Sequence, residues 1–120
     1  MSFWKDKKVL VTGGNGEVEA MFEATKPDVV IHLAGKVGGI AANKASPGTF
    51  FYDNIMMGTL VLEYARRNNV QKTVALAAGC GYPLNLDVPY DEEDFWDGLP
   101  QVESMGYSMG KKMLIIQSWT

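Results

Sequence analysis

The sequence has one cysteine and few basic residues, and these shortages exclude several classes of protein. With Cys80 alone, the 120-residue chain forms no internal disulfide, and we expect a reducing, cytoplasmic location. The 11 Lys and Arg are outnumbered by 14 Asp and Glu and form no basic run, which argues against a nucleic-acid partner. No apolar run is long enough for a signal peptide or a membrane span, so we expect no membrane partner.

What the sequence does contain is typical of one globular domain spanning residues 1–120, since 47% of the residues are apolar and 21% are charged. Three apolar runs each end in glycine, as buried parallel strands often do, and they cover residues 7–13, 28–35 and 71–79.

Three amphipathic stretches alternate with these runs. The first, residues 17–25, has Val18, Met21 and Phe22 on one helical face. The second begins at Thr49 and has arginines in its last turn; its predicted inner face is Phe51, Ile55, Gly58, Leu62 and Ala65. The third covers residues 104–119, after a long loop that begins at Cys80. The alternation predicts an α/β, Rossmann-like parallel sheet with flanking helices, whose ligands bind beyond the carboxyl ends of the strands.

A glycine-rich turn, Gly13-Gly14-Asn15-Gly16, follows the first predicted strand. Glycines there let a phosphate approach the backbone, so the turn is a candidate pyrophosphate site, although a tight structural turn explains it equally well. The third glycine of the usual fingerprint is replaced by Glu19, which would hinder close packing of helix on strand.

Tyr107 and Lys111 stand four residues apart and therefore share one face of the last predicted helix. An ammonium near the phenol would lower the pKa of Tyr107 and make it a usable general acid or base. Taken alone, the pair is better explained by a tyrosine beside a solvated lysine, because this spacing is common by chance.

Cys80 lies just past the third predicted strand, where a thiol could transfer protons; a small apolar filler is the plainer interpretation. We interpret His32, inside the second strand, as structural, and no set of residues suggests a metal site.

Several stretches together resemble the extended short-chain dehydrogenase/reductases that act on nucleotide sugars, the NAD-dependent epimerase/dehydratase family. They are "VTGGNG", "DVVIHLAG", "NIMMGTLVLEYA" and "YSMGK". "LAGKVGGIAAN", "SPGTFFYDN" and "GCGYP" narrow the resemblance to the GDP-L-fucose synthase branch, which converts GDP-4-keto-6-deoxymannose to GDP-L-fucose with NADPH.

The resemblance implies a role for each matching residue. Tyr107 would protonate the substrate C4 oxygen, Lys111 would hold the nicotinamide ribose, and Cys80 would move protons during epimerisation. The turn at residues 13–16 would face the pyrophosphate, and Ala34, Gly35 and Lys36 would line the cofactor. The implied cofactor is NADP, with NAD as the alternative, and the implied partners are a nucleotide sugar and a second copy bound through the long helices.

The sequence also departs from the family pattern. Ala78 stands where the family has a Ser or Thr that hydrogen-bonds the substrate oxygen, and such a donor is commonly worth about 10²–10³ in rate. After Gly16 the sequence lacks the rest of the family's phosphate-binding helix and the strand–helix–strand passage that follows it. It also lacks the acidic residue that contacts the adenosine ribose in the family. The family's histidine and sugar-nucleotide lobe would lie beyond Thr120.

Three functions therefore remain open. The chain is the core of a nucleotide-sugar epimerase-reductase, a non-catalytic relative that folds or oligomerises without turnover, or an epimerase or dehydratase for another nucleotide sugar.

Overall fold

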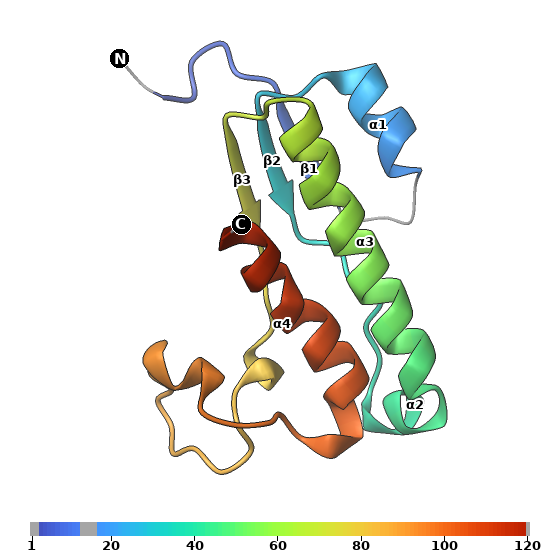
Figure 1. Ribbon diagram of the computed structural model, residues 1–120, viewed down its shortest axis with the longest axis vertical. Coiled ribbons are helices and arrows are strands. Elements are labelled where there is room, and N and C mark those ends of the chain that lie inside the picture. Colours follow the sequence, from blue (N-terminus) through green and yellow to red (C-terminus); the bar gives the residue numbers. More distant parts are fainter. Residues whose placement is uncertain (1–2, 13–16, 120) are drawn as a thin grey trace.

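The computed structural model describes residues 3–12 and 17–119. The helices and strands alternate as predicted, from β1 to α4 (Figure 1). Their bounds are β1 Val9–Thr12, α1 Val18–Thr25, β2 Val29–His32, α2 Ile40–Ala45, α3 Pro47–Arg67, β3 Lys72–Ala75 and α4 Met105–Trp119. The long helix begins two residues earlier than predicted, because proline fits the first turn of a helix.

The three strands form one parallel sheet in the order β1-β2-β3. Val9 pairs with Val29 and Val29 with Lys72, and this register continues to the carboxyl ends of the strands. The Rossmann-like α/β fold predicted from the sequence is confirmed. Within the described residues β1 pairs on one side only, with β2, and so lies at an edge of the sheet.

The hydrophobic core lies between one face of the sheet and helices α1 and α3. Phe22 of α1, Val30 of β2 and Val61 of α3 are almost fully buried together. The other face is much less covered, and Val11 and Val74 there are 56% and 37% exposed. This asymmetry follows from chain order, because right-handed crossovers that all move in one direction place their helices on the same face.

Helices α3 and α4 lie side by side along much of their length (Figure 1). Their close approach depends on glycine: a Cβ at Gly58 would come within 2.0 Å of Leu114 Cδ2, and one at Gly106 within 2.3 Å of the Pro47 carbonyl oxygen. Gln117 Nε2 of α4 also donates to the carbonyl oxygen of Thr59 at 3.1 Å.

The predicted inner face of the long helix was displaced by about one position. Phe51 is 40% exposed, and the buried residues of α3 are Phe50, Asn54, Gly58, Val61 and Ala65. The reason is that this face meets α4 and the segment after β2 as well as the sheet, so a polar residue, Asn54, is buried on it.

The loop between β3 and α4 contains three short 3-10 turns, at Gly79–Gly81, Glu93–Trp96 and Val102–Ser104. It extends along one side of α4 (Figure 1). Among the described residues, none of the helices combines the length and the apolar character needed to cross a membrane.

Candidate active site

The site predicted from the sequence lies at the carboxyl end of β2, where α4 meets the segment Ala34–Lys36. Lys111 donates from Nζ to the carbonyl oxygen of Ala34 at 2.9 Å. A Cβ built on Gly35 would lie 3.7 Å from Lys111 Nζ and 3.8 Å from Tyr107 Cε2. The structure therefore brings Gly35 together with Tyr107 and Lys111, which lie more than 70 residues later in the chain.

Asn54 of α3 holds this segment in place, and sequence reasoning missed it. Its Oδ1 accepts from the backbone N–H of Lys36 at 3.0 Å, and its Nδ2 donates to the carbonyl oxygen of Lys36 at 3.0 Å. Nδ2 also donates to the Phe50 carbonyl at 2.7 Å. A buried amide with these partners fixes the backbone after β2. The available signal was a polar residue on the inner face of an amphipathic helix.

The Lys36 side chain turns toward α3 and forms an ion pair with Asp53, Nζ to Oδ2 at 2.6 Å. Its backbone stays at the candidate site, whereas its ammonium lines a separate pocket of about 300 Å³ with Tyr52 and Met56. The side chain is 41% exposed, so the pair contributes little to stability.

Cys80 lies in the Gly79–Gly81 turn and is exposed. Its sulfur accepts a hydrogen bond from Ser108 Oγ, the next residue after Tyr107, at 3.2 Å. It lines a pocket of about 230 Å³ with Tyr82, Tyr90 and Gln101. The structure thus places Cys80 against α4 beside Tyr107. Ala78 presents no hydroxyl there, and its methyl lines a different, aromatic pocket.

Burial governs the ionisation of Tyr107 and Lys111. The pKa of Tyr107 is raised above its ordinary value by burial, and the negative charge of Cys80 raises it further. The expectation that Lys111 lowers this pKa was wrong, because the Lys111 ammonium points to the Ala34 carbonyl. Burial lowers the pKa of Lys111, whose side chain is 3% exposed.

His32 is structural in its geometry. It is 1% exposed, and its Nδ1 lies 2.6 Å from Thr12 Oγ1 across the β1–β2 pair. Burial, with a smaller contribution from the charge of Lys111, lowers its pKa from 6.5 to about 4. It therefore stays neutral at neutral pH.

The predicted pyrophosphate turn, Gly13, Gly14, Asn15 and Gly16, lies outside the described residues. Within residues 3–12 and 17–119, no three side chains of His, Cys, Asp or Glu gather into a metal-binding group.

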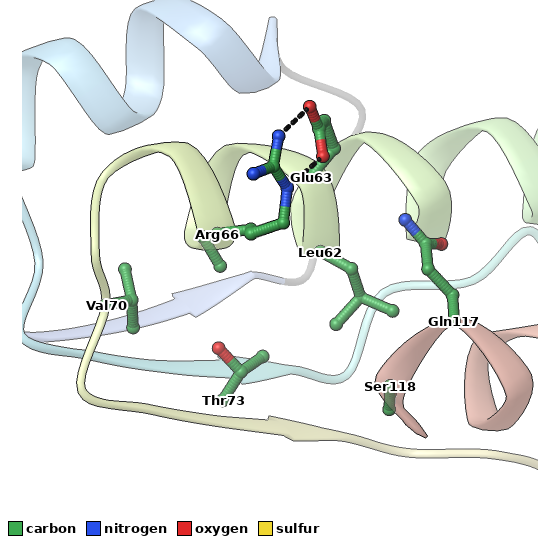
Figure 2. Close-up of a pocket in the computed structure, with 8 residues that line it drawn as sticks. Leu62, Glu63, Arg66, Val70, Thr73, Gln117 and Ser118 are labelled. Carbon is green, nitrogen blue, oxygen red and sulfur yellow. Dashed lines mark hydrogen bonds and ion pairs between the residues drawn. The ribbon is translucent and has the colours of Figure 1, made fainter. Parts of the chain in front are cut away.

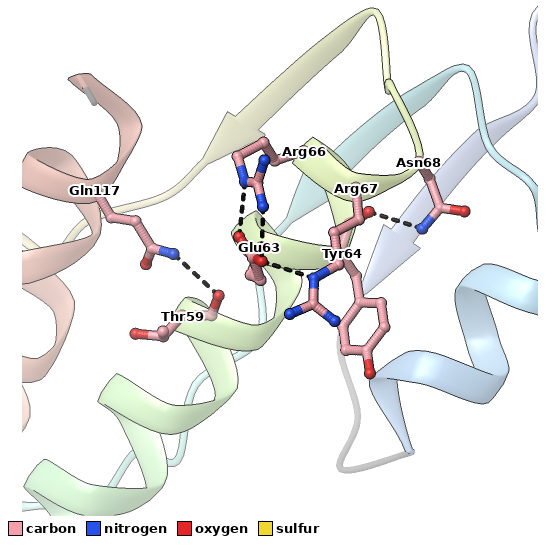
Figure 3. Close-up of polar contacts among 7 residues, drawn as sticks. All are labelled: Thr59, Glu63, Tyr64, Arg66, Arg67, Asn68 and Gln117. Carbon is pink, nitrogen blue, oxygen red and sulfur yellow. Dashed lines mark hydrogen bonds and ion pairs between the residues drawn. The ribbon is translucent and has the colours of Figure 1, made fainter.

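A larger pocket, of about 520 Å³, lies elsewhere, between the last turns of α3 and α4 (Figure 2). Its charged groups are paired with each other: Glu63 accepts from Arg66 at 2.8 Å and from Arg67 at 2.7 Å (Figure 3). These bonds lower the pKa of Glu63 to about 2. The two charged side chains that line this pocket, Glu63 and Arg66, are thus paired with each other.

Residues 9–119 match the NAD dependent epimerase/dehydratase family.

The chain belongs to this family.

The chain is 32% identical to a GDP-L-fucose synthase of Azorhizobium caulinodans over 89% of its length, and covers 44% of that protein. Its structure resembles that of a GDP-L-fucose synthetase from Naegleria fowleri bound to NADP, with a TM-score of 0.83 and 25% identity; the match covers 99% of this chain and 46% of that one. A GDP-D-glycero-L-gluco-heptose synthase from Campylobacter jejuni, solved in the presence of NADPH, gives a TM-score of 0.76 and 31% identity over 83% of this chain and 29% of that one.

The chain therefore spans less than half the length of these epimerase/dehydratase relatives. The match to the Azorhizobium protein runs over 138 residues although it uses 89% of a 120-residue chain. That relative thus carries residues inside the matched region that have no counterpart here, in keeping with the passage predicted to be missing after Gly16.

Proposed function

We propose that this chain carries the proton-transfer residues of an NADPH-dependent epimerase-reductase for a 4-keto nucleotide sugar. The reaction it fits best is the conversion of GDP-4-keto-6-deoxymannose to GDP-L-fucose. The observation that supports this most is the convergence of Tyr107 and Lys111 on Gly35 at the carboxyl end of β2, with Cys80 held against the next residue of the same helix.

The residues present fit the nicotinamide half of the cofactor. Gly35 offers bare backbone beside Tyr107 and Lys111. The Lys111 ammonium has three N–H donors, and the Ala34 carbonyl takes one of them, which leaves donors for the ribose hydroxyls. When bound, NADPH supplies the hydride that reduces the keto carbon. The other residue proposed to line the cofactor is Lys36, through its backbone.

Tyr107 acts as the general acid. Within the described residues its hydroxyl makes no hydrogen bond, so its proton is free to be donated to the C4 oxygen as the carbon is reduced. Its raised pKa keeps the phenol protonated at neutral pH, which suits a proton donor.

Cys80 acts on the carbon next to the keto group. Its thiolate removes the proton from that carbon, so that an S–H bond forms, the C–H bond breaks and the electron pair moves onto the carbonyl oxygen as an enolate. Solvent water returns a proton to the carbon from the opposite side, and the exposed thiol gives its proton up to solvent, which completes the epimerisation. Ala78 supplies no hydroxyl to the keto oxygen, so we expect turnover about 10²–10³ slower than with a serine there.

The test is NADPH oxidation by the chain with GDP-4-keto-6-deoxymannose, followed by the loss of NADPH absorbance. We expect oxidation that Tyr107→Phe abolishes while NADPH binding persists, and that Tyr52→Phe, at a residue 62% exposed on α3, leaves unchanged. Cys80→Ser should slow epimerisation more than reduction. Unchanged turnover in Tyr107→Phe would refute the role of the phenol.

A non-catalytic alternative has its own support. The open face of the sheet exposes Val9, Val11 and Val74, and β1 has a free edge, a combination that favours self-association. In that case the chain would form oligomers whose size grows with concentration, and millimolar NADPH would leave its melting temperature unchanged. Pairing through α3 and α4 remains a prediction; Tyr52, Met56 and Ile116 are exposed there.

Within the enzyme hypothesis, the identity of the nucleotide-sugar substrate is a separate point to test. Similarity to the Campylobacter heptose synthase favours including GDP-4-keto-heptoses among the substrates tested. Faster NADPH oxidation with such a heptose than with GDP-4-keto-6-deoxymannose would replace the fucose assignment.

A further inference from the structure

Helix α4 carries two pairs of residues at helical spacing, displaced by one position. Tyr107 and Lys111 face the end of β2, as described above. Ser108 and Lys112 face the turn that holds Cys80. One helix therefore fixes the phenol and the thiol relative to each other.

The Ser108 hydroxyl has an unusual hydrogen-bond partner for a serine in a helix. A buried serine in a helix commonly donates back to the carbonyl four residues earlier, and Ser118 of the same helix does so, to Leu114 at 2.7 Å. Ser108 is 0% exposed and donates instead across the helix surface to Cys80 Sγ at 3.2 Å. A second hydroxyl, Ser104 Oγ, stands 3.3 Å behind it.

Lys112 keeps the Cys80 turn against the helix, so that the contact with Ser108 is maintained. Its ammonium is 3% exposed and donates to the carbonyl oxygens of Gly81 at 3.1 Å, of Phe95, and of Gly98 at 3.5 Å. The same Nζ lies 4.6 Å and 4.8 Å from the ring centroids of Phe95 and Trp96. These contacts hold both ends of the loop that follows the thiol.

We infer that Ser108 is a positioning residue for Cys80: its hydroxyl donates to the sulfur and fixes the direction of Sγ, and Ser104 supports it as a second hydroxyl. Ser104 Oγ also has the Gln101 carbonyl oxygen as an acceptor at 3.5 Å. When the sulfur is ionised, Ser104 turns its proton from that carbonyl to Ser108 and Ser108 donates to the sulfur, so two hydroxyls in line share the charge. The role of the thiolate in epimerisation rests on the proposed function; the hydrogen bond itself does not.

The titratable groups around Cys80 are few. Tyr107 and Lys112 face it from α4, and Tyr82 and Tyr90 line its pocket from the loop. None of these four changes in the variants below, so a change in the reactivity of the thiol reports on the hydroxyls.

The experiment measures alkylation of Cys80 by iodoacetamide as a function of pH, with adduct counted by mass spectrometry. Because Cys80 is the only cysteine of the chain, every adduct reports on it. In Ser108→Ala we expect the profile to move to higher pH and the rate at neutral pH to fall about tenfold, the usual effect of losing one hydrogen bond to a charged group. Ser104→Ala should move it less in the same direction.

Ser118→Ala is the matched control, since it removes a hydroxyl from the same helix that bonds only within the helix. Its profile should coincide with that of the unmodified chain, and all variants should react alike in denaturant. A Ser108→Ala profile that coincides with the control would overturn the inference. Should Ser108→Ala not fold, Ser104→Ala decides, because an unmoved profile there contradicts the two-hydroxyl chain. The assay contains neither NADPH nor sugar, so its result is independent of the proposed function.

Discussion

Lys111 donates a hydrogen bond to the carbonyl oxygen of Ala34, 77 residues earlier in the chain, and so joins α4 to the end of β2. The bond is buried, and the lysine is 3% exposed. A buried ammonium without this acceptor would be costly, so the bond constrains where α4 can lie. The position of α4 in turn sets the position of Tyr107, and changes that move this helix should therefore move the candidate active site.

Gly106→Ala is expected to destabilise the chain by about 1–3 kcal/mol, because the new methyl would lie 2.3 Å from the backbone oxygen of Pro47, which cannot rotate away. Urea unfolding measures this. Gly48→Ala in α3 is the control: a Cβ there meets nothing within 4 Å, so the better helix propensity of alanine should leave stability unchanged or slightly higher. Equal stabilities for the two variants would contradict the close packing of α3 and α4.

Lys112→Met is expected to cost about 2–4 kcal/mol, because the carbonyls of Gly81, Phe95 and Gly98 lose a buried charged donor. Amide hydrogen exchange across residues 81–98 should become faster. Lys44→Met removes an ammonium whose side chain is 59% exposed, and should stay within about 0.5 kcal/mol. If exchange in the loop is the same in both variants, Lys112 does not hold it.

Because the pKa of His32 is lowered in the folded chain, we predict a loss of folding stability in mild acid. Its pKa is about 4 in the folded chain and 6.5 when unfolded, so below pH 6.5 the unfolded state binds a proton that the folded state does not. Stability should therefore fall by up to about 3 kcal/mol as the pH drops from 6.5 to 4. His32→Gln cannot titrate, and its stability should lack this component. Parallel pH profiles for the two chains would show that the folded state also protonates His32.

Much of the fold was predictable because it is encoded locally. Apolar runs that end in glycine predicted the three strands. Their alternation with amphipathic stretches predicted the parallel sheet, with ligands bound beyond the carboxyl ends of its strands. Tyr107 and Lys111 were recognisable from helical spacing combined with the family motif.

The parts of the candidate site that the sequence did not predict depend on contacts between distant residues, which no local pattern encodes. Ser108 and Lys112 act on the Cys80 turn from 28 and 31 residues away, and Asn54 reaches back 18 residues to Lys36. The raised pKa of Tyr107 could not be predicted from the sequence either. Helical spacing placed Lys111 on the same face as Tyr107, but it did not reveal that the Lys111 ammonium binds the Ala34 carbonyl.

The most direct test of the account is whether the phenol at 107 and the thiol at 80 lie at one site in solution. A nitroxide attached to Cys80, the single cysteine, broadens the NMR signals of nearby groups. We predict strong broadening of the Tyr107 ring, and sharp signals for the ring of Tyr64, which lies near the far end of α3 (Figure 3). A Tyr107 ring as sharp as that of Tyr64 would contradict the shared site.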